Sequence, residues 1–214
     1  MIATSRIMLA VAGGCVLAML LFPGGAVAAK RPTCEVPRSK TYLANQTVRV
    51  FTTRHSTDTA LGQGTDVVLR ACLRRHGRPF ALAAKTAVDT GGFGDFANVR
   101  LAGRYVALTT RSCDRHGMMC AGGVEVWDVR TRRLVRSADG TWASDLELHP
   151  NGSVAWITAP LVSTAPAGEA EVRVDDRAGE RTLATGAIGA DSLALGGSRL
   201  YWTEDGVPRS SAVP

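Results

Sequence analysis

Three leucines that recur at intervals of 47 residues constrain this chain more than any other feature of its sequence. Leu101, Leu148 and Leu195 each begin a similar stretch, and the three stretches read LAGRYVAL, LHPNGSVAWI and LGGSRLYW. In each stretch a turn sequence rich in Gly or Asn separates two short apolar segments. A fixed period in this range is typical of proteins in which small units of similar build follow one another along the chain.

The residues between these leucines follow the alternation of β-strands, and helical periodicity is nearly absent after residue 30. Strands are expected at 98–102, 105–109, 124–129 and 134–137, and again at 146–148, 154–158, 171–174 and 182–185. The first repeat (TYLANQTVRVF, VVLRACLRR, FALAA) and the last (SLALGG, RLYWTE, VPRSSAV) are less regular, and the last is short of an edge strand. The sequence therefore predicts an all-β, β-propeller-like fold of about four four-stranded antiparallel blades. Whether the blades close a ring is left open.

The stretch VEVWDVRTRRLV, from Val124 to Val135, is similar to the unit of third strand, turn and fourth strand in the WD40-like and TolB-like β-propeller superfamily. In that unit a strand ending in Asp precedes a turn rich in Thr, Arg and Gly. The resemblance covers most of residues 38–208 and implies a propeller-type scaffold. Those families usually have six to eight blades, whereas four fit here at most, and the Trp127-Asp128 pair occurs once. A propeller scaffold by itself names no activity.

Residues 1–29 have the pattern of a secretory signal peptide. Arg6 supplies the positive start, an apolar run follows, and Ala26-Val27-Ala28 is a small-residue cleavage pattern. The alternative is an uncleaved membrane anchor, because the apolar run approaches the length that spans a bilayer. The favoured interpretation is a secreted or cell-envelope protein with one domain at residues 30–214 and no membrane span after cleavage.

The cysteines agree with export. Cys34, Cys72, Cys113 and Cys120 remain after the signal peptide, and an even number in an exported chain favours disulfides. Of the three possible connectivities we favour Cys34–Cys72 together with Cys113–Cys120. A metal site at Cys113, His116 and Cys120 is the alternative, although this spacing fits no common zinc pattern and a fourth ligand is missing.

Basic residues gather in turns that a propeller-like fold would bring to one face. The chain carries 25 Lys and Arg residues against 19 Asp and Glu, and nearly all of the basic residues are arginines. The expected turns after first strands contain Arg104 and Arg199. The turns between third and fourth strands contain the predicted anion-binding residues Arg74, Arg75, Arg78, Arg130, Arg132, Arg133, Arg177 and Arg181. Guanidinium groups pair with phosphates and carboxylates, so this face predicts an acidic partner. The equally weighted alternative is a set of solvated turns without a ligand.

No motif of a catalytic or cofactor site is present: the chain has neither G-x-S-x-G nor H-E-x-x-H. Asp89 and Asp95 flank a Gly-rich run whose oxygens could hold Ca²⁺, but a connection between blades is favoured there. The sequence therefore predicts a non-catalytic binding or scaffold protein with no catalytic, cofactor or metal residues. The alternative is a small envelope enzyme of hydrolase or lyase type with its site on the face of the long loops, expected at Thr52–Asp66, Thr110–Gly122 and Ala159–Gly168.

The expected partners follow from export and charge. They are a protein or an anionic envelope polymer, whereas nucleic acid is not expected for an exported chain. An open arc of blades would also leave strand edges that can pair with a second copy, which would give a homodimer.

Overall fold

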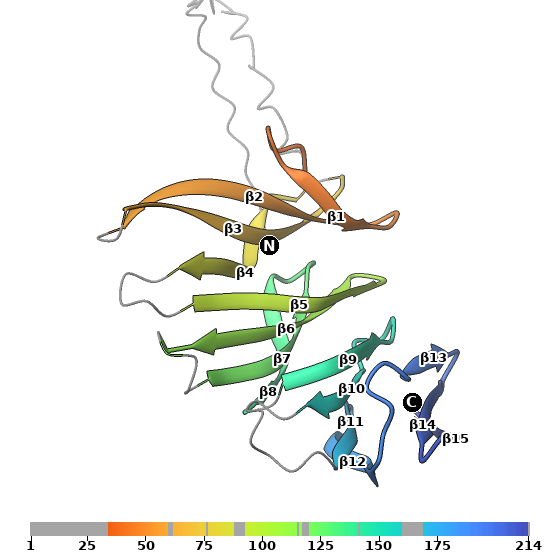
Figure 1. The fold of residues 1–214 in the computed structure, drawn as a ribbon. Coiled ribbons are helices and arrows are strands. Elements are labelled where there is room, and N and C mark those ends of the chain that lie inside the picture. The colour runs from red at the N-terminus through yellow and green to blue at the C-terminus, as the bar shows by residue number, and fades with distance from the viewer. Residues whose placement is uncertain are drawn as a thin grey trace, which may run out of the picture. The chain divides into compact units, whose positions relative to one another are not determined.

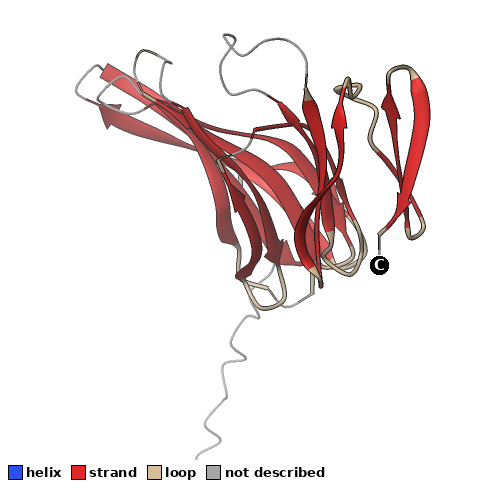
Figure 2. Ribbon diagram, turned by 90° about the horizontal axis from the view of Figure 1, so that it is seen from below, coloured by secondary structure: helices blue, strands red, loops and turns tan. Residues whose placement is uncertain are grey.

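Antiparallel β-strands form the framework of the protein. The computed structural model describes residues 34–213 apart from 60–61, 76, 88–92, 115, 117–119, 141 and 160–168. These residues contain strands, turns and loops but no helix (Figure 2). The all-β, antiparallel part of the prediction is thereby confirmed, and the predicted signal peptide at residues 1–29 lies outside the described residues. In the described part of the chain, no helix has the length and apolar character that crossing a membrane requires.

The first eight strands pair in sequence order into one antiparallel sheet (Figure 1). They are β1 (Lys40–Ala44), β2 (Val48–Thr59), β3 (Gly62–Leu73), β4 (Phe80–Ala87), β5 (Phe93–Ala102), β6 (Tyr105–Cys113), β7 (Cys120–Asp128) and β8 (Arg133–Asp139). The link between β4 and β5 is short, because only Thr86 and Ala87 pair with Gly94 and Phe93. We therefore describe β1–β4 as group 1 and β5–β8 as group 2.

Two smaller sheets follow. Group 3 is a four-stranded sheet and group 4 a three-stranded sheet, each built from consecutive antiparallel strands. Their strands are β9 (Trp142–Leu148), β10 (Val154–Ala159), β11 (Ala170–Asp176), β12 (Gly179–Gly186), β13 (Ala194–Gly196), β14 (Arg199–Glu204) and β15 (Val207–Ala212). The four groups coincide with the four sequence repeats, and the last group has three strands as expected.

Three of the four groups, namely 1, 2 and 4, share a backbone hydrogen bond as well as a strand order. In group 1 the Arg74 amide donates to the carbonyl of Thr47 over 2.9 Å, and in group 2 the Val129 amide donates to that of Arg104 over 3.1 Å. In group 4 the Val213 amide donates to the carbonyl of Ser198 over 2.8 Å. Each bond joins the residue before the second strand to the residue after the third. The sequence period thus corresponds to a structural one.

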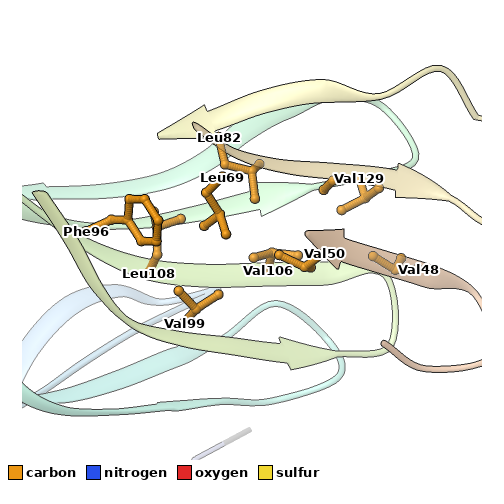
Figure 3. Packing of buried hydrophobic residues seen from close by; sticks show 10 residues of the cluster. Val48, Val50, Leu69, Leu82, Phe96, Val99, Val106, Leu108 and Val129 are labelled. Carbon is orange, nitrogen blue, oxygen red and sulfur yellow. The ribbon is translucent and has the colours of Figure 1, made fainter. Parts of the chain in front are cut away.

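Hydrophobic cores lie between neighbouring groups. Group 1 packs Leu69 and Leu82 against Phe96 and Leu108 of group 2, and these side chains point toward one another in Figure 3. Groups 2 and 3 bury a second cluster that includes Trp156, and groups 3 and 4 bury a third that includes Trp202. Each of these three clusters takes side chains from two groups, so a group depends on its neighbour to bury these apolar residues.

Two of the expected loops are wrong. Thr52–Asp66 is a long hairpin, since β2 and β3 pair along their whole length from Val48↔Leu73 to Thr59↔Gly62. Thr110–Gly122 is mostly strand, because β6 continues to Cys113 and β7 begins at Cys120. Both segments are polar and so resemble loops, yet Thr favours strands and antiparallel pairing satisfies the backbone. Most of the third expected loop, Ala159–Gly168, lies outside the described residues.

Candidate binding surface

Turns from three successive groups line a groove with a volume of about 340 Å³. We call the turns that follow the first and third strands of each group the turn face. Groups 1 and 2 provide the turns before β2 and β6, and group 3 provides the turns before β10 and β12. The lining residues are Thr47, Gly103, Arg104, Tyr105, Pro150, Asn151 and Arg177. Because no single group could form this groove, its presence depends on how the groups pack.

Arg104, one of the lining residues, is held in place by two neighbouring side chains. Its Nε atom lies 3.1 Å from Oδ2 of Asp128, and its Nη2 donates to the Tyr105 hydroxyl over 2.7 Å. The guanidinium carbon also lies 4.9 Å from the centre of the Tyr105 ring. Among the described residues no hydrogen bond occupies the Nη1 donors of Arg104, so they remain available for a ligand.

Asp128 explains why Arg104 is fixed. This carboxylate is nearly inaccessible, with 3% of the residue exposed, and its Oδ1 accepts the amide of Arg130 over 2.9 Å. It therefore closes the β7–β8 turn and orients Arg104 at the same time. A buried carboxylate needs such partners, since an unpaired charge in the interior is costly.

Arg177 supplies a charge of a different kind. It is exposed, and its side chain forms no hydrogen bond or ion pair within the part of the chain that the structure describes. The turn that carries it is closed by a hydrogen bond, because Oδ1 of the buried Asp176 accepts the Ala178 amide over 2.8 Å. Arg177 is thus a free guanidinium on an ordered turn, which suits it to an acidic ligand.

Arg136 connects two of the turns that line the groove. From β8 its Nε donates to the carbonyl of Gly152 over 2.9 Å, and its Nη1 donates to the carbonyl of Asp176 over 2.6 Å. The same Nη1 atom pairs with Asp175 at 2.7 Å. Arg136 fixes the β9–β10 turn against the β11–β12 turn. Sequence reasoning missed it, since it lies inside a strand and carries no turn signal.

The predicted anion-binding arginines fall into two classes. Arg74, Arg75, Arg78, Arg130, Arg132, Arg133 and Arg177 are exposed in turns or at their edges, as expected. Arg181 instead donates from Nη2 to Oδ2 of the buried Asp176 over 2.7 Å. This hydrogen bond is the main reason why the pKa of Asp176 lies below its usual value and the pKa of Arg181 above its own. Arg181 therefore stabilises the fold and is not free to bind an anion.

The cysteines pair as predicted. Cys34 and Cys72 are joined with their Cα atoms 5.8 Å apart, and Cys113 and Cys120 with theirs 4.0 Å apart. The first pair attaches the start of the described chain to β3, where both cysteines pack against Phe51. The second joins the end of β6 to the start of β7. A cystine offers no thiolate, so the alternative metal site at Cys113, His116 and Cys120 is not supported.

Only part of the alternative calcium site at Asp89 and Asp95 lies within the described residues. Asp89 lies outside the described residues, and Asp95 forms an ion pair with Lys85 and accepts the amide of Phe96 over 2.7 Å. Asp95 is thus engaged within the sheet. Over the residues that the structure describes, His, Cys, Asp and Glu do not gather in groups of three or more that could hold a metal ion.

Comparison of the chain with protein-family models, with curated proteins and with solved structures finds no match. The turn face itself presents three groups that can contact a ligand. These are a fixed guanidinium, a free guanidinium and an aromatic ring around one groove.

Proposed function

We propose that this protein is an exported, non-catalytic binding module that holds an acidic partner in the groove of its turn face. The partner is a protein or an anionic envelope polymer that presents carboxylate or phosphate groups. The observation that carries the proposal is the groove, into which Arg104 and Arg177 are brought from two different groups.

The chemistry of the groove favours an acidic ligand over a neutral one. Arg104 keeps its Nη1 donors available while Asp128 and Tyr105 hold the rest of its guanidinium, and planar guanidinium donors match carboxylates and phosphates. Arg177 adds an unpaired positive charge, and Arg74, Arg75, Arg130, Arg132 and Arg133 add to the field on the same face. Tyr105 adds an aromatic side chain to the groove lining, where an apolar part of the ligand can make contact.

Two features support export. Residues 1–29 have the pattern of a signal peptide, and both cysteine pairs lie at disulfide distance, as is typical of proteins in an oxidising compartment.

We also propose that the four groups are blades of a small propeller-like scaffold of the WD40-like or TolB-like type. The shared strand order, the equivalent closing hydrogen bonds and the apolar clusters between successive groups support this arrangement. Propellers use exposed turns and loops on a rigid scaffold for binding, which agrees with a site on the turn face.

The test is binding of fluorescent polyphosphate and poly-glutamate, measured by anisotropy at about 0.05 M and about 0.5 M salt. Arg177→Glu should weaken binding of at least one polymer by roughly tenfold at low salt, because an attractive charge becomes repulsive. The matched control is Arg54→Glu, which makes the same change of net charge seven residues along β2 from Thr47. Equal losses in the two variants, or none in either, would refute a site at the groove.

A further inference from the structure

The fourth strand of each complete group carries one extra residue opposite the third strand. The register between β3 and β4 shifts at Leu82, between β7 and β8 at Val135, and between β11 and β12 at Leu183. The extra residue is apolar in all three groups. Such bulges reorient the side chains around them, so the same backbone device recurs at equivalent places.

The bulge in β8 differs from the other two in its surroundings. Leu82 is 7% exposed in the core between groups 1 and 2, and Leu183 packs against the cluster between groups 3 and 4. Val135, by contrast, is 44% exposed. The residue before the bulge differs as well. It is Ala81 in β4 and Thr182 in β12, but it is Leu134 in β8, and Leu134 is 43% exposed. Group 2 thus exposes two neighbouring apolar side chains. At the same two positions group 1 has the buried Leu82 and the small Ala81, and group 3 has the partly buried Leu183 and the polar Thr182.

Three arginines lie directly before these apolar residues. Arg130, Arg132 and Arg133 occupy the β7–β8 turn and the first position of β8, and all three are exposed. Their side chains form no hydrogen bond or ion pair with the residues that the structure describes. The carboxylate nearest in sequence, Asp128, is buried and already lies against Arg104. The charge of this turn is therefore not neutralised within the described part of the protein.

We propose that Arg130, Arg132, Arg133, Leu134 and Val135 form a docking patch for an anionic lipid surface. Lipid phosphates attract clustered arginines, and the apolar side chains beside them enter the boundary between headgroups and acyl chains. A soluble anionic polymer would use the arginines but would leave Leu134 and Val135 in water. An uncharged apolar partner would use the leucine and valine but would not explain three unpaired arginines. An anionic bilayer satisfies both halves of the patch.

This proposal goes beyond ligand binding in the groove, because it concerns where the protein resides. The groove is lined by Arg104 and Arg177 and contains none of the five patch residues. Variants can therefore separate the two sites. Docking through the β7–β8 turn would hold the protein at a membrane surface through residues of its folded domain.

The test is sedimentation with phosphatidylcholine vesicles that contain about 30% phosphatidylglycerol, compared with pure phosphatidylcholine vesicles, at about 0.05 M and about 0.5 M salt. The protein should bind the anionic vesicles at low salt and lose most binding at high salt. Leu134→Ser with Val135→Ser should lower the partition coefficient about tenfold. Arg130→Gln with Arg133→Gln should lower it about fivefold for each arginine removed.

The matched control removes equally exposed apolar side chains elsewhere. Tyr201 and Val207 in group 4 are 44% and 49% exposed, and Tyr201→Ser with Val207→Ser should leave the partition coefficient unchanged. Leu134→Thr alone copies Thr182 of group 3, so it provides a substitution that an equivalent strand already accepts. It should lower vesicle binding even if the double serine variant does not fold.

Three results would overturn the proposal. The first is equal binding to both kinds of vesicle. The second is full vesicle binding by Leu134→Thr and the double serine variant while the arginine variant loses it, which would make the patch a contact for anionic polymers only. The third is a concentration-dependent dimer, seen by sedimentation velocity, that the serine variant abolishes without changing vesicle binding. That outcome would assign the apolar residues to a second copy of the chain.

Discussion

The carboxylate of Asp176 accepts a 2.7 Å hydrogen bond from Arg181 across the β11–β12 turn, although Asp176 is inaccessible to solvent and Arg181 is not. The same carboxylate caps the turn through the amide of Ala178. One buried group therefore closes the turn that carries Arg177 and removes Arg181 from the binding surface. This arrangement makes the stability of the fold depend on pH.

Acid should destabilise the protein in part through Asp176. Its pKa in the folded state lies below the reference value of 3.8, chiefly because of the hydrogen bond from Arg181. The ionised carboxylate thus contributes stability that is fully present above the reference value and is lost as the pH falls through the folded pKa. Asp176→Asn should cost about 1–3 kcal/mol at about pH 7, and this cost should shrink at about pH 3.

Urea unfolding at the two pH values measures this effect. Asp205→Asn is the control, since Asp205 lies in an exposed turn with a positive φ that Asn also tolerates. A cost for Asp176→Asn that stays the same at both pH values would contradict the assigned role of the carboxylate.

Removal of the two disulfides should have unequal effects. The bridged cysteines are 38 residues apart in Cys34–Cys72 and 7 residues apart in Cys113–Cys120. On the chain-entropy model the longer loop gives about 4 kcal/mol and the shorter about 2.5 kcal/mol. Cys34→Ser with Cys72→Ser should therefore lower the free energy of unfolding more than Cys113→Ser with Cys120→Ser. Non-reducing peptide mapping checks the pairing itself, and free Cys113 in protein made under oxidising conditions would contradict it.

Gly152→Ala should destabilise the β9–β10 turn through both strain and crowding. Gly152 has φ of 89°, and a Cβ atom there would lie 3.1 Å from the ring of Tyr105 in the groove. Gly140→Ala is the matched control, because φ is 77° but no atom lies within 4 Å of the added carbon. We expect a loss of about 1 kcal/mol for Gly140→Ala and a clearly larger loss for Gly152→Ala in thermal or urea unfolding. Equal losses would show that a small movement relieves the close contact between the added Cβ atom and the Tyr105 ring.

Shortening the extra residue of the bulge should lower the free energy of unfolding more in β4 than in β8, although the two strands have the same kind of bulge. Leu82→Ala removes a buried side chain from the core between groups 1 and 2 and should cost about 2–4 kcal/mol. Val135→Ala removes a half-exposed side chain and should cost less than about 1 kcal/mol. A loss for Val135→Ala as large as that for Leu82→Ala would mean that Val135 is buried in solution, which would also remove the apolar half of the docking patch.

Much of the local structure could be predicted from short-range pattern. The alternation around Leu101, Leu148 and Leu195 located the strands of groups 2 to 4, since strand formation follows residue-to-residue periodicity. The same reasoning failed for Thr52–Asp66, where a polar composition suggested a loop. In this segment β2 and β3 satisfy each other's backbone hydrogen-bonding groups. The composition of either strand does not show that the other will pair with it.

The candidate site could be predicted only in outline. The turn signals correctly placed Arg177 and Arg130 in exposed turns. They could not distinguish Arg177 from Arg181, because the difference is whether a buried carboxylate lies within reach. The role of Arg136 could not be predicted from the sequence, because its partners Gly152 and Asp176 belong to a different sheet.

The repeat, most of the strands, many of the turns and the pairing cysteines follow from the sequence alone, because each depends on residue types at short or fixed spacing. The packing of the groups sets which charged side chains form ion pairs within the fold and which apolar side chains stay exposed. Leu82 and Val135 occupy equivalent bulges, yet one is buried and the other is not. Burial and ion pairing depend on which sheets meet across a distance in sequence, and no local pattern encodes that contact.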